Sequence, residues 1–263
     1  MNDRGYSNSM LLAITCYNCR HQIERVLAKV KEREDWFKEI IVVDNRSADD
    51  TAEVAEAAIS SLQFDRARVQ VNPRNSGLGG SHKFIFDYAS NKGNFSHVVI
   101  LHGDDQADIS DLKSIFPLSA PDKSFLGSRF LPESKLSGYS KFRIFGNRVF
   151  NALFSLALGS KVQDLGSGLN VFSREIFTKN YVFMCPNDLT FNCWLLIFII
   201  KNSHYSYFPI SWRETDQTSN VRLFSQSFRT LKLVLGLRFS SKWFRRKTAE
   251  HLKDRTTYSW IQN

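Results

Sequence analysis

The residues best suited to chemistry follow a short apolar run near the middle of the chain. Residues 98–101 are all apolar and predict a buried strand, and residues 102–108 (His-Gly-Asp-Asp-Gln-Ala-Asp) follow it directly. In an open α/β sheet, ligands bind at the carboxyl ends of the strands. Carboxylates clustered there repel one another unless a cation lies among them, and oxygen ligands with one imidazole suit Mg²⁺ or Mn²⁺. We therefore predict a divalent metal site that holds a phosphate.

Several other polar residues have a simpler explanation as helix caps. Asp108 and Ser110 precede one predicted helix, and Ser47 or Asp49 precede another. Asp188 stands just before the apolar residues 194–200 and could cap the helix that they predict. These residues need not contact a ligand.

Length and composition indicate one α/β domain with an appendage. The chain has 263 residues, of which 43% are hydrophobic, so it can bury a full core. Residues 1–9 lack the apolar core of a signal peptide, and no uncharged apolar run approaches the ~20 residues that a membrane span needs. We therefore expect a cytoplasmic protein whose four cysteines stay reduced.

Alternating strands and helices predict the architecture of that domain. Apolar runs and helical spacing place strands at residues 10–15, 39–44, 69–71 and 98–101, with helices at 21–33, 52–62 and 81–90 between them. This alternation predicts a mostly parallel sheet with helices on both faces.

Two features near the predicted strand ends could bind a nucleotide. Asp44 ends the second strand, where a carboxylate can accept from a base imide or a ribose hydroxyl. Residues 72–80 form a glycine-rich loop that opens a helix, which could cradle a phosphate or could be a tight turn. Its spacing matches neither the Walker pattern nor Gly-x-Gly-x-x-Gly.

Cys16 and Cys19 form a Cys-x-x-Cys pair whose flanking residues favour neither a redox nor a zinc site.

The tail, residues 222–263, differs in charge from residues 1–221. Residues 222–255 contain ten Lys or Arg against two acidic residues, so they carry most of the net charge of +9. Phe224, Phe228, Leu231 and Leu235 recur at helical spacing, and Phe239, Trp243 and Phe244 lie among further cations. We expect an amphipathic helical segment on an anionic membrane surface, although residues 224–235 could instead pack as core. No nucleic-acid-reading motif accompanies the charge, so we expect no nucleic-acid partner.

Several ordered motifs resemble those of family-2 glycosyltransferases with the GT-A fold. They are residues 13–18 (Ala-Ile-Thr-Cys-Tyr-Asn), 41–51, 75–79 (Asn-Ser-Gly-Leu-Gly), 102–106 and 127–129 (Gly-Ser-Arg). Within that family the chain most resembles the dolichyl-phosphate mannose synthase and bacterial polyprenyl-phosphate glycosyltransferase branch. Residues 164–170 and 208–213 fit that branch too.

The chain departs from the family pattern where the metal binds. The family's Asp-x-Asp-x-Gln motif aligns onto His102, Asp104 and Gln106, so an imidazole replaces one carboxylate. Losing an anionic ligand should weaken the site, and Asp105 is a candidate to compensate. Alternatively, His102 caps the strand end by hydrogen bonding.

The resemblance implies roles for individual residues. It places the nucleotide sugar on Thr15, Tyr17, Asn18, Asp44, Asn45, Gly79 and Asp104, the divalent metal (Mg²⁺ or Mn²⁺) on His102, Asp104 and Gln106, and the acceptor phosphate on Arg129, Arg143 and Ser167. Catalytic roles are implied for Asp104, Asp105, Arg129 and Asp188.

The implied reaction is inverting transfer of a sugar from a nucleoside-diphosphate sugar to a polyprenyl phosphate, on the inner face of the membrane. An integral-membrane partner is a further expectation. Two alternatives stay open: transfer to a saccharide hydroxyl with Asp188 as base, and a non-catalytic family member docked on a membrane.

Overall fold

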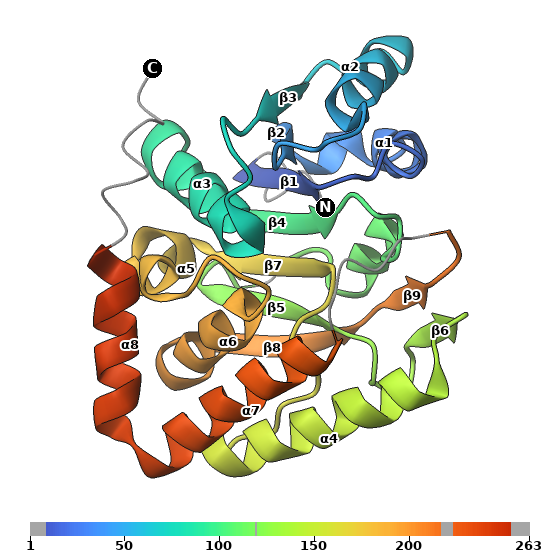
Figure 1. The fold of residues 1–263 in the computed structure, drawn as a ribbon. Coiled ribbons are helices and arrows are strands. Elements are labelled where there is room, and N and C mark those ends of the chain that lie inside the picture. The colour runs from blue at the N-terminus through green and yellow to red at the C-terminus, as the bar shows by residue number, and fades with distance from the viewer. Residues whose placement is uncertain (1–8, 119, 217–222, 254–263) are drawn as a thin grey trace.

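The computed structural model describes residues 9–118, 120–216 and 223–253 (Figure 1). A central sheet of seven strands has the order β3-β2-β1-β4-β7-β5-β8. The strands are β1 (Met10–Cys16), β2 (Glu39–Asp44), β3 (Ala67–Val71), β4 (His97–His102), β5 (Lys123–Ser128), β7 (Leu169–Ser173) and β8 (His204–Pro209). All pairings are parallel except those of β7, which runs antiparallel between β4 and β5. The prediction of a mostly parallel sheet is therefore confirmed.

Two layers of helices cover the sheet because successive strand residues point to opposite faces. Ile40 and Val42 of β2 pack with α1 (Ile23–Lys31) and α2 (Thr51–Ser61). Ile41 and Val43 join the core on the other face, with α3 (Gly77–Lys92), α5 (Arg174–Thr178) and α6 (Phe191–Asn202). Short 3-10 helices lie at η2 (Glu34–Trp36), η3 (Ile109–Ser114) and η4 (Asn180–Met184).

Three further helices and a small sheet complete the described chain. Strands β6 (Lys135–Ser137) and β9 (Ser211–Arg213) pair in parallel. Helices α4 (Lys141–Leu158) and α7 (Leu223–Phe239) pack side by side, and α8 (Ser241–Lys253) turns back along the domain (Figure 1). No helix among the described residues is long and apolar enough to cross a membrane.

Helix α8 corrects one expectation about the tail. Its aromatic residues were expected to lie on a membrane surface, yet the Phe244 ring stacks on Trp194 of α6 with 4.9 Å between ring centroids. Trp243 lies 6.1 Å from the same indole. Residues 254–263 lie outside the described part of the chain. The α8 aromatics therefore attach the tail to the domain.

The predicted caps are partly confirmed. Asp108 accepts from the Ser110 amide at 2.9 Å, and Asp49 accepts from the Thr51 amide at 3.2 Å as α2 begins. Ser47 does not cap α2, because its hydroxyl bonds Asp44 and accepts from the amide of Asn18.

Candidate active site

The loops after β1 and β2 are fastened to each other. Asn18 has a φ of 54°, in the left-handed region that asparagine tolerates better than most residues. Its side-chain oxygen accepts from the Ala48 amide at 2.9 Å, and its own amide donates to the Ser47 hydroxyl at 2.9 Å. Tyr17, 39% exposed, stands beside it in the same loop. The two loops therefore form one unit at the carboxyl edge of the sheet.

Asp44 is fixed inside this unit. It is 2% exposed, and one carboxylate oxygen accepts from the Ser47 amide at 3.0 Å while the other accepts from the Ser47 hydroxyl. An ionised carboxylate has about four acceptor positions, so these two bonds leave capacity for a ligand hydroxyl or imide. The geometry suits the predicted nucleoside contact.

Asn45 joins the β2 loop to the glycine-rich loop. Its side chain donates to Asn75 at 2.9 Å and accepts from Asn72 at 3.1 Å and from the Ser76 amide at 2.9 Å. Asn45 is 6% exposed, so its main role is to position the two loops.

The glycines of that loop serve packing. The Gly79 amide donates to the Asn187 carbonyl at 2.9 Å, and a Cβ on Gly79 would lie 2.3 Å from the Pro186 carbonyl oxygen. Gly77 has a φ of 72°, and its amide donates to Asn75 at 2.9 Å. Both amides are already bonded, so these glycines provide close packing in place of the phosphate cradle expected at Gly79.

At the end of β4, His102 presents a neutral imidazole. Burial and the positive charge of Arg129 lower the pKa of His102 to about 4. The ring lies edge-on to His82, 6.4 Å between centroids, and makes no hydrogen bond to any residue of the described ranges. The alternative that His102 caps the strand end through its ring is therefore not supported.

Asp104 is the first carboxylate after His102, two residues further along the chain. Burial, together with the charges of Asp105 and Glu214, raises the pKa of Asp104 to about 6. One of its oxygens accepts from the Gln106 amide at 3.2 Å. The adjacent loop is held by the Gly103 amide, which donates to the Thr15 carbonyl at 2.9 Å. Thr15 thus positions this site through its backbone.

Asp105 faces away from the predicted metal site. It has a φ of 58° and is 7% exposed, and its carboxylate pairs with Lys29 and with Arg25 at 3.2 Å, both on α1. Arg213 of β9 lies 3.7 Å away. The expectation that Asp105 replaces the missing metal ligand is wrong, because three cations already neutralise it. Asp105 instead ties the β4 loop to α1 and β9.

The donor set fits a cation only if the substrate supplies most of the ligands. No group of three His, Cys, Asp or Glu side chains that could hold a metal is found within the described residues. His102 and Asp104 remain as possible ligands, and the side-chain amide oxygen of Gln106 is a neutral third one. Mg²⁺ is commonly bound through one or two carboxylates together with substrate phosphates and water. A metal bridging to a diphosphate fits this site, while a metal bound by protein alone does not.

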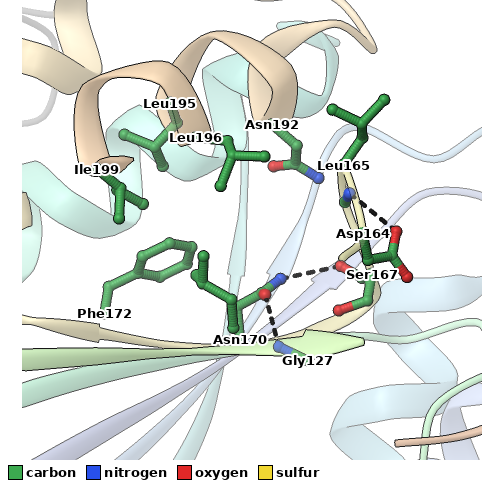
Figure 2. Close-up of a pocket in the computed structure, with 12 residues that line it drawn as sticks. Gly127, Asp164, Leu165, Ser167, Asn170, Phe172, Asn192, Leu195, Leu196 and Ile199 are labelled. Atoms are coloured by element: carbon green, nitrogen blue, oxygen red, sulfur yellow. Dashed lines mark hydrogen bonds between the residues drawn. The ribbon is translucent and has the colours of Figure 1, made fainter. Parts of the chain in front are cut away.

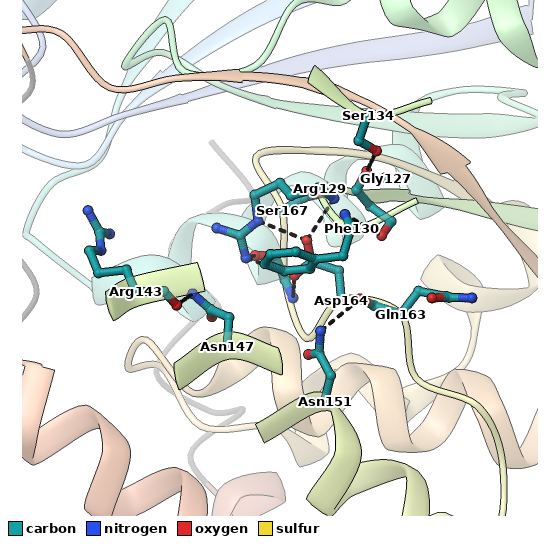
Figure 3. Close-up of polar contacts among 12 residues, drawn as sticks. Gly127, Arg129, Phe130, Ser134, Arg143, Asn147, Asn151, Gln163, Asp164 and Ser167 are labelled. Carbon is teal, nitrogen blue, oxygen red and sulfur yellow. Dashed lines mark hydrogen bonds and ion pairs between the residues drawn. The ribbon is translucent and has the colours of Figure 1, made fainter. Parts of the chain in front are cut away.

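A second polar cluster centres on Arg129, directly after β5 (Figure 3). Arg129 is 8% exposed, and its Nε and Nη2 donate to the two oxygens of Asp164 at 2.8 and 2.7 Å. Against the lowering effect of burial, Asp164 raises the pKa of Arg129 above its ordinary value. The guanidinium also donates to the Tyr139 hydroxyl at 3.2 Å and lies 4.8 Å from the centre of the Trp212 ring.

Arg143 of α4 also lies against Tyr139. Its guanidinium carbon is 5.2 Å from the Tyr139 ring centre, and its Nη1 bonds both oxygens of Glu214 at 2.6 and 2.7 Å. Asn147, one turn further along α4, donates to the Tyr139 hydroxyl at 2.6 Å. The side chain of Arg143 is 29% exposed, so it is the more accessible of the two guanidinium groups.

Ser167 is turned into the protein. It is 2% exposed, and its hydroxyl donates to the Leu169 carbonyl at 3.0 Å. Ser167 and Asn170 line a small pocket of about 20 Å³ between β5, β7 and α6 (Figure 2), which has room for about one water molecule. The predicted contact of Ser167 with an acceptor phosphate would require the hydrogen bond from its hydroxyl to the Leu169 carbonyl to break.

Asp188 lies in the turn just before α6. One oxygen accepts from the Thr190 amide at 2.8 Å, and the other pairs with Arg229 of α7 at 2.6 Å. The N-cap of α6 is Thr190, so Asp188 holds the turn before the helix and does not cap it. The catalytic role of Asp188 stays a prediction.

Sequence reasoning missed the partners of the two arginines. Asp164 begins a motif that had been singled out without a role for its carboxylate, so a signal existed. Glu214 and Tyr139 lie 71 and 10 residues from the arginines that they contact. No local pattern marks either one.

Comparisons with known proteins give the family and the fold of this chain. The model of Glycosyl transferase family 2 matches residues 12–180. Glycosyltransferase AglJ of Haloferax volcanii is 28% identical over 147 residues, which cover 55% of this chain and 44% of that protein. A mycobacterial protein has a TM-score of 0.67 at 17% identity, over 90% of this chain and 77% of that one. Glucosyl-3-phosphoglycerate synthase of Mycobacterium tuberculosis, solved with Mn²⁺, UDP-glucose and glycerol 3-phosphate, has a TM-score of 0.63 at 18% identity, over 88% and 80% of the two chains.

The family match and the structural likeness have different weight. The aligned segment spans less than half of the Haloferax volcanii relative, so that protein's own activity does not transfer as a whole. At 17–18% identity the solved structures show the fold, which is GT-A. The family model covers more than half of the chain. The chain therefore belongs to glycosyl transferase family 2 and is a glycosyltransferase with the GT-A fold.

Proposed function

We propose that this glycosyltransferase moves a sugar from a nucleoside-diphosphate sugar to a polyprenyl phosphate at the cytoplasmic face of a membrane. The observation that carries the proposal is the pair of guanidinium groups of Arg129 and Arg143, whose central carbons lie 5.6 and 5.2 Å from the centre of the Tyr139 ring. Guanidinium groups bind phosphate through two parallel hydrogen bonds, which suits a phosphate monoester acceptor.

The donor would lie across the loops after β1, β2 and β4. Asp44 would accept from the nucleoside, and the exposed Tyr17 ring offers a surface beside it. His102, Asp104 and Gln106 would hold a divalent cation on the diphosphate, as the Mn²⁺ and UDP-glucose of the mycobacterial synthase suggest by analogy. When bound, the metal supplies charge stabilisation of the leaving diphosphate.

The acceptor phosphate would compete with carboxylates for the arginines. Glu214 occupies Arg143 here, and Arg143 is the more exposed guanidinium, so it is the one that can exchange a carboxylate for a phosphate. Arg129 is held by Asp164 on two nitrogens, and its Nη1 already donates one hydrogen to Tyr139, so it would contribute positive charge and the second hydrogen of Nη1. Exchange at Arg143 would release the Glu214 carboxylate.

A groove beside the cluster offers a path for a lipid acceptor. It has a volume of about 530 Å³ and lies between α4 and residues 161–163. Phe130 and Leu156 supply apolar surface, and Arg148 and Lys161 supply positive charge. Phe130 also contacts the Arg129 guanidinium, 5.4 Å from the ring centre, so the groove ends near the arginines. A phosphate attached to an apolar chain matches this lining.

The chemistry needs little from a protein base. An acceptor phosphate oxygen, already ionised at neutral pH, would attack the anomeric carbon, and the bond to the nucleoside diphosphate would break with inversion. The side chains would act by orienting the two substrates and by stabilising charge. The ion pair between Asp188 and Arg229 agrees with a reaction that requires no carboxylate base there.

A transfer assay tests the proposal. Purified protein with Mn²⁺ and a panel of labelled sugar nucleotides would be offered a short-chain prenyl phosphate, the matching prenol, or 3-phosphoglycerate. We expect labelled product only with the prenyl phosphate. Transfer to the prenol would favour the hydroxyl acceptor with Asp188 as base, and transfer to 3-phosphoglycerate would favour a small soluble acceptor.

A further inference from the structure

Helix α4 has an apolar face that no other described residue covers. Its inner side carries Asn147, Asn151 and Phe154, which face the Arg129–Asp164 pair and the core (Figure 3). Its outer side carries a stripe at helical spacing whose exposed fractions are 76% at Phe142, 67% at Phe145, 39% at Val149 and 79% at Leu156.

Helix α7 repeats this arrangement. Its inner side buries Thr230, Leu233 and Val234. Its outer side exposes a second stripe, with fractions of 68% at Phe228, 39% at Leu231, 48% at Leu235 and 76% at Phe239. The stripe expected from sequence is therefore exposed at Phe228, Leu231 and Leu235, while the side chain of Phe224 lies outside the described residues.

The two stripes belong to one surface, which we call the α4–α7 face. The helices pack against each other and lie side by side along one edge of the molecule (Figure 1). Of the ten large hydrophobic side chains that are exposed in the described chain, eight are on these two helices. A concentration of this kind on a soluble domain marks an interaction site.

The charges on this face have one sign. Neither α4 nor α7 contains an Asp or Glu. Exposed cations flank the stripes: Lys141 and Arg148 on α4, and Lys232 and Arg238 on α7. A second copy of this chain docked face to face would bring these cations together. An anionic surface with an apolar interior would satisfy both the aromatic side chains and the cations.

We infer that the α4–α7 face is a membrane-docking surface that inserts its aromatic side chains into an anionic lipid bilayer. The inference goes beyond the proposed function, because it does not depend on which acceptor the enzyme uses. It also relocates the membrane contact expected for residues 240–255, since the α8 aromatics pack on Trp194. The groove lined by Arg148 and Leu156 borders this face.

Vesicle flotation tests the inference with the full chain. Wild-type protein should float with vesicles of phosphatidylcholine and phosphatidylglycerol and should bind phosphatidylcholine alone much less. Changing Phe142, Phe145, Phe228 and Phe239 together to Ser should lower the partition coefficient by more than about tenfold. Changing Lys232 and Arg238 to Ser should lower it about fivefold per cation, whereas Lys92→Ser with Lys113→Ser, exposed cations elsewhere, should change little.

A second measurement separates insertion from self-association and from misfolding. Phe142→Trp and Phe239→Trp keep an aromatic ring at each end of the face, so both should retain flotation. Their added fluorescence should be quenched by brominated lipid, and wild-type protein should sediment as a monomer without vesicles. Absence of flotation by wild-type protein, or a dimer that the four Phe→Ser changes dissociate, would overturn the inference. Unchanged thermal unfolding of the Ser variants serves as the folding control.

Discussion

The donor region and the acceptor region are built in different ways. Asp44 and Asp104 bond groups only 3 and 2 residues away, so short loops at the strand ends fix them. Arg129 and Arg143 are held by carboxylates 35 and 71 residues away. The two donor-side carboxylates are thus fixed within their own loops, whereas the two acceptor-side arginines depend on long-range pairs that neutralise their charge. A donor can bind to a prepared site, but an acceptor phosphate must first displace a carboxylate.

The largest expected effect would break the acceptor region. Asp164→Asn leaves the Arg129 guanidinium buried without its carboxylate, so the free energy of unfolding should fall by about 3–5 kcal/mol. Urea unfolding measures this loss. Asp50→Asn, which breaks the exposed Arg20 pair, is the matched control and should leave stability nearly unchanged. An equally small effect at Asp164 would show that the long-range pair does not hold the region together.

The next effect would disable the donor region without unfolding it. Asp104→Asn removes the charged ligand proposed for the metal, so transfer at saturating acceptor should fall by about 100-fold or more. UDP binding in the presence of Mn²⁺ should weaken in calorimetry, while thermal unfolding without ligand should stay cooperative. Wild-type transfer by this variant would show that the metal assignment is wrong.

A gain of affinity would sharpen the donor region. His102→Asp restores a second carboxylate beside Asp104, which should tighten Mn²⁺ binding in the presence of UDP by about tenfold. Titration of free Mn²⁺ by electron paramagnetic resonance reports this constant. His102→Ala serves as the control for loss of the imidazole, and unchanged affinity in both variants would make His102 structural.

A further effect concerns the acid dependence of stability. Burial and the charge of His102 lower the pKa of His82 to about 3. Below pH 6.5 the unfolded chain therefore binds a proton at His82, and the folded chain does not bind it until about pH 3. Stability from this group is therefore lost as pH falls. For Asp104, with a pKa of about 6, the folded chain binds the proton first and stability rises as pH falls from about 6 to 3.8. Urea unfolding at several pH values should show a shallower acid loss in His82→Gln and a steeper one in Asp104→Asn; equal slopes would contradict both directions.

The sequence predicted the fold well where the signal is local. Apolar runs marked β1, β2 and β4 to within a residue or two, because a strand buried on both faces needs continuous apolar residues. The same logic located Asp44 and Asp104 at strand ends. It could not reveal that β7 runs antiparallel between β4 and β5, since that depends on pairing across the sheet.

The sequence-based predictions failed mainly where they depended on the direction in which a side chain points. Asp105 follows Asp104 directly, yet its left-handed backbone turns it toward Lys29 and Arg25. The α4 stripe has the periodicity of a core face, and only the tertiary structure shows that nothing described covers Phe142 or Phe145. Trp243 and Phe244 look like interface residues from their charged neighbours, but Trp194 offers them a core.

The division between donor and acceptor regions is tested most directly by steady-state kinetics of Arg143→Lys. Lysine keeps the charge but loses the planar guanidinium, which can offer a phosphate two parallel N–H donors. Arg143 now contacts both oxygens of Glu214 through Nη1, and it lies outside the buried Arg129–Asp164 pair. We predict that KM for prenyl phosphate rises about tenfold while KM for the sugar nucleotide stays within about twofold of wild type. A rise in the KM for the sugar nucleotide that equals or exceeds the rise in the KM for prenyl phosphate would contradict the assignment of this cluster to the acceptor.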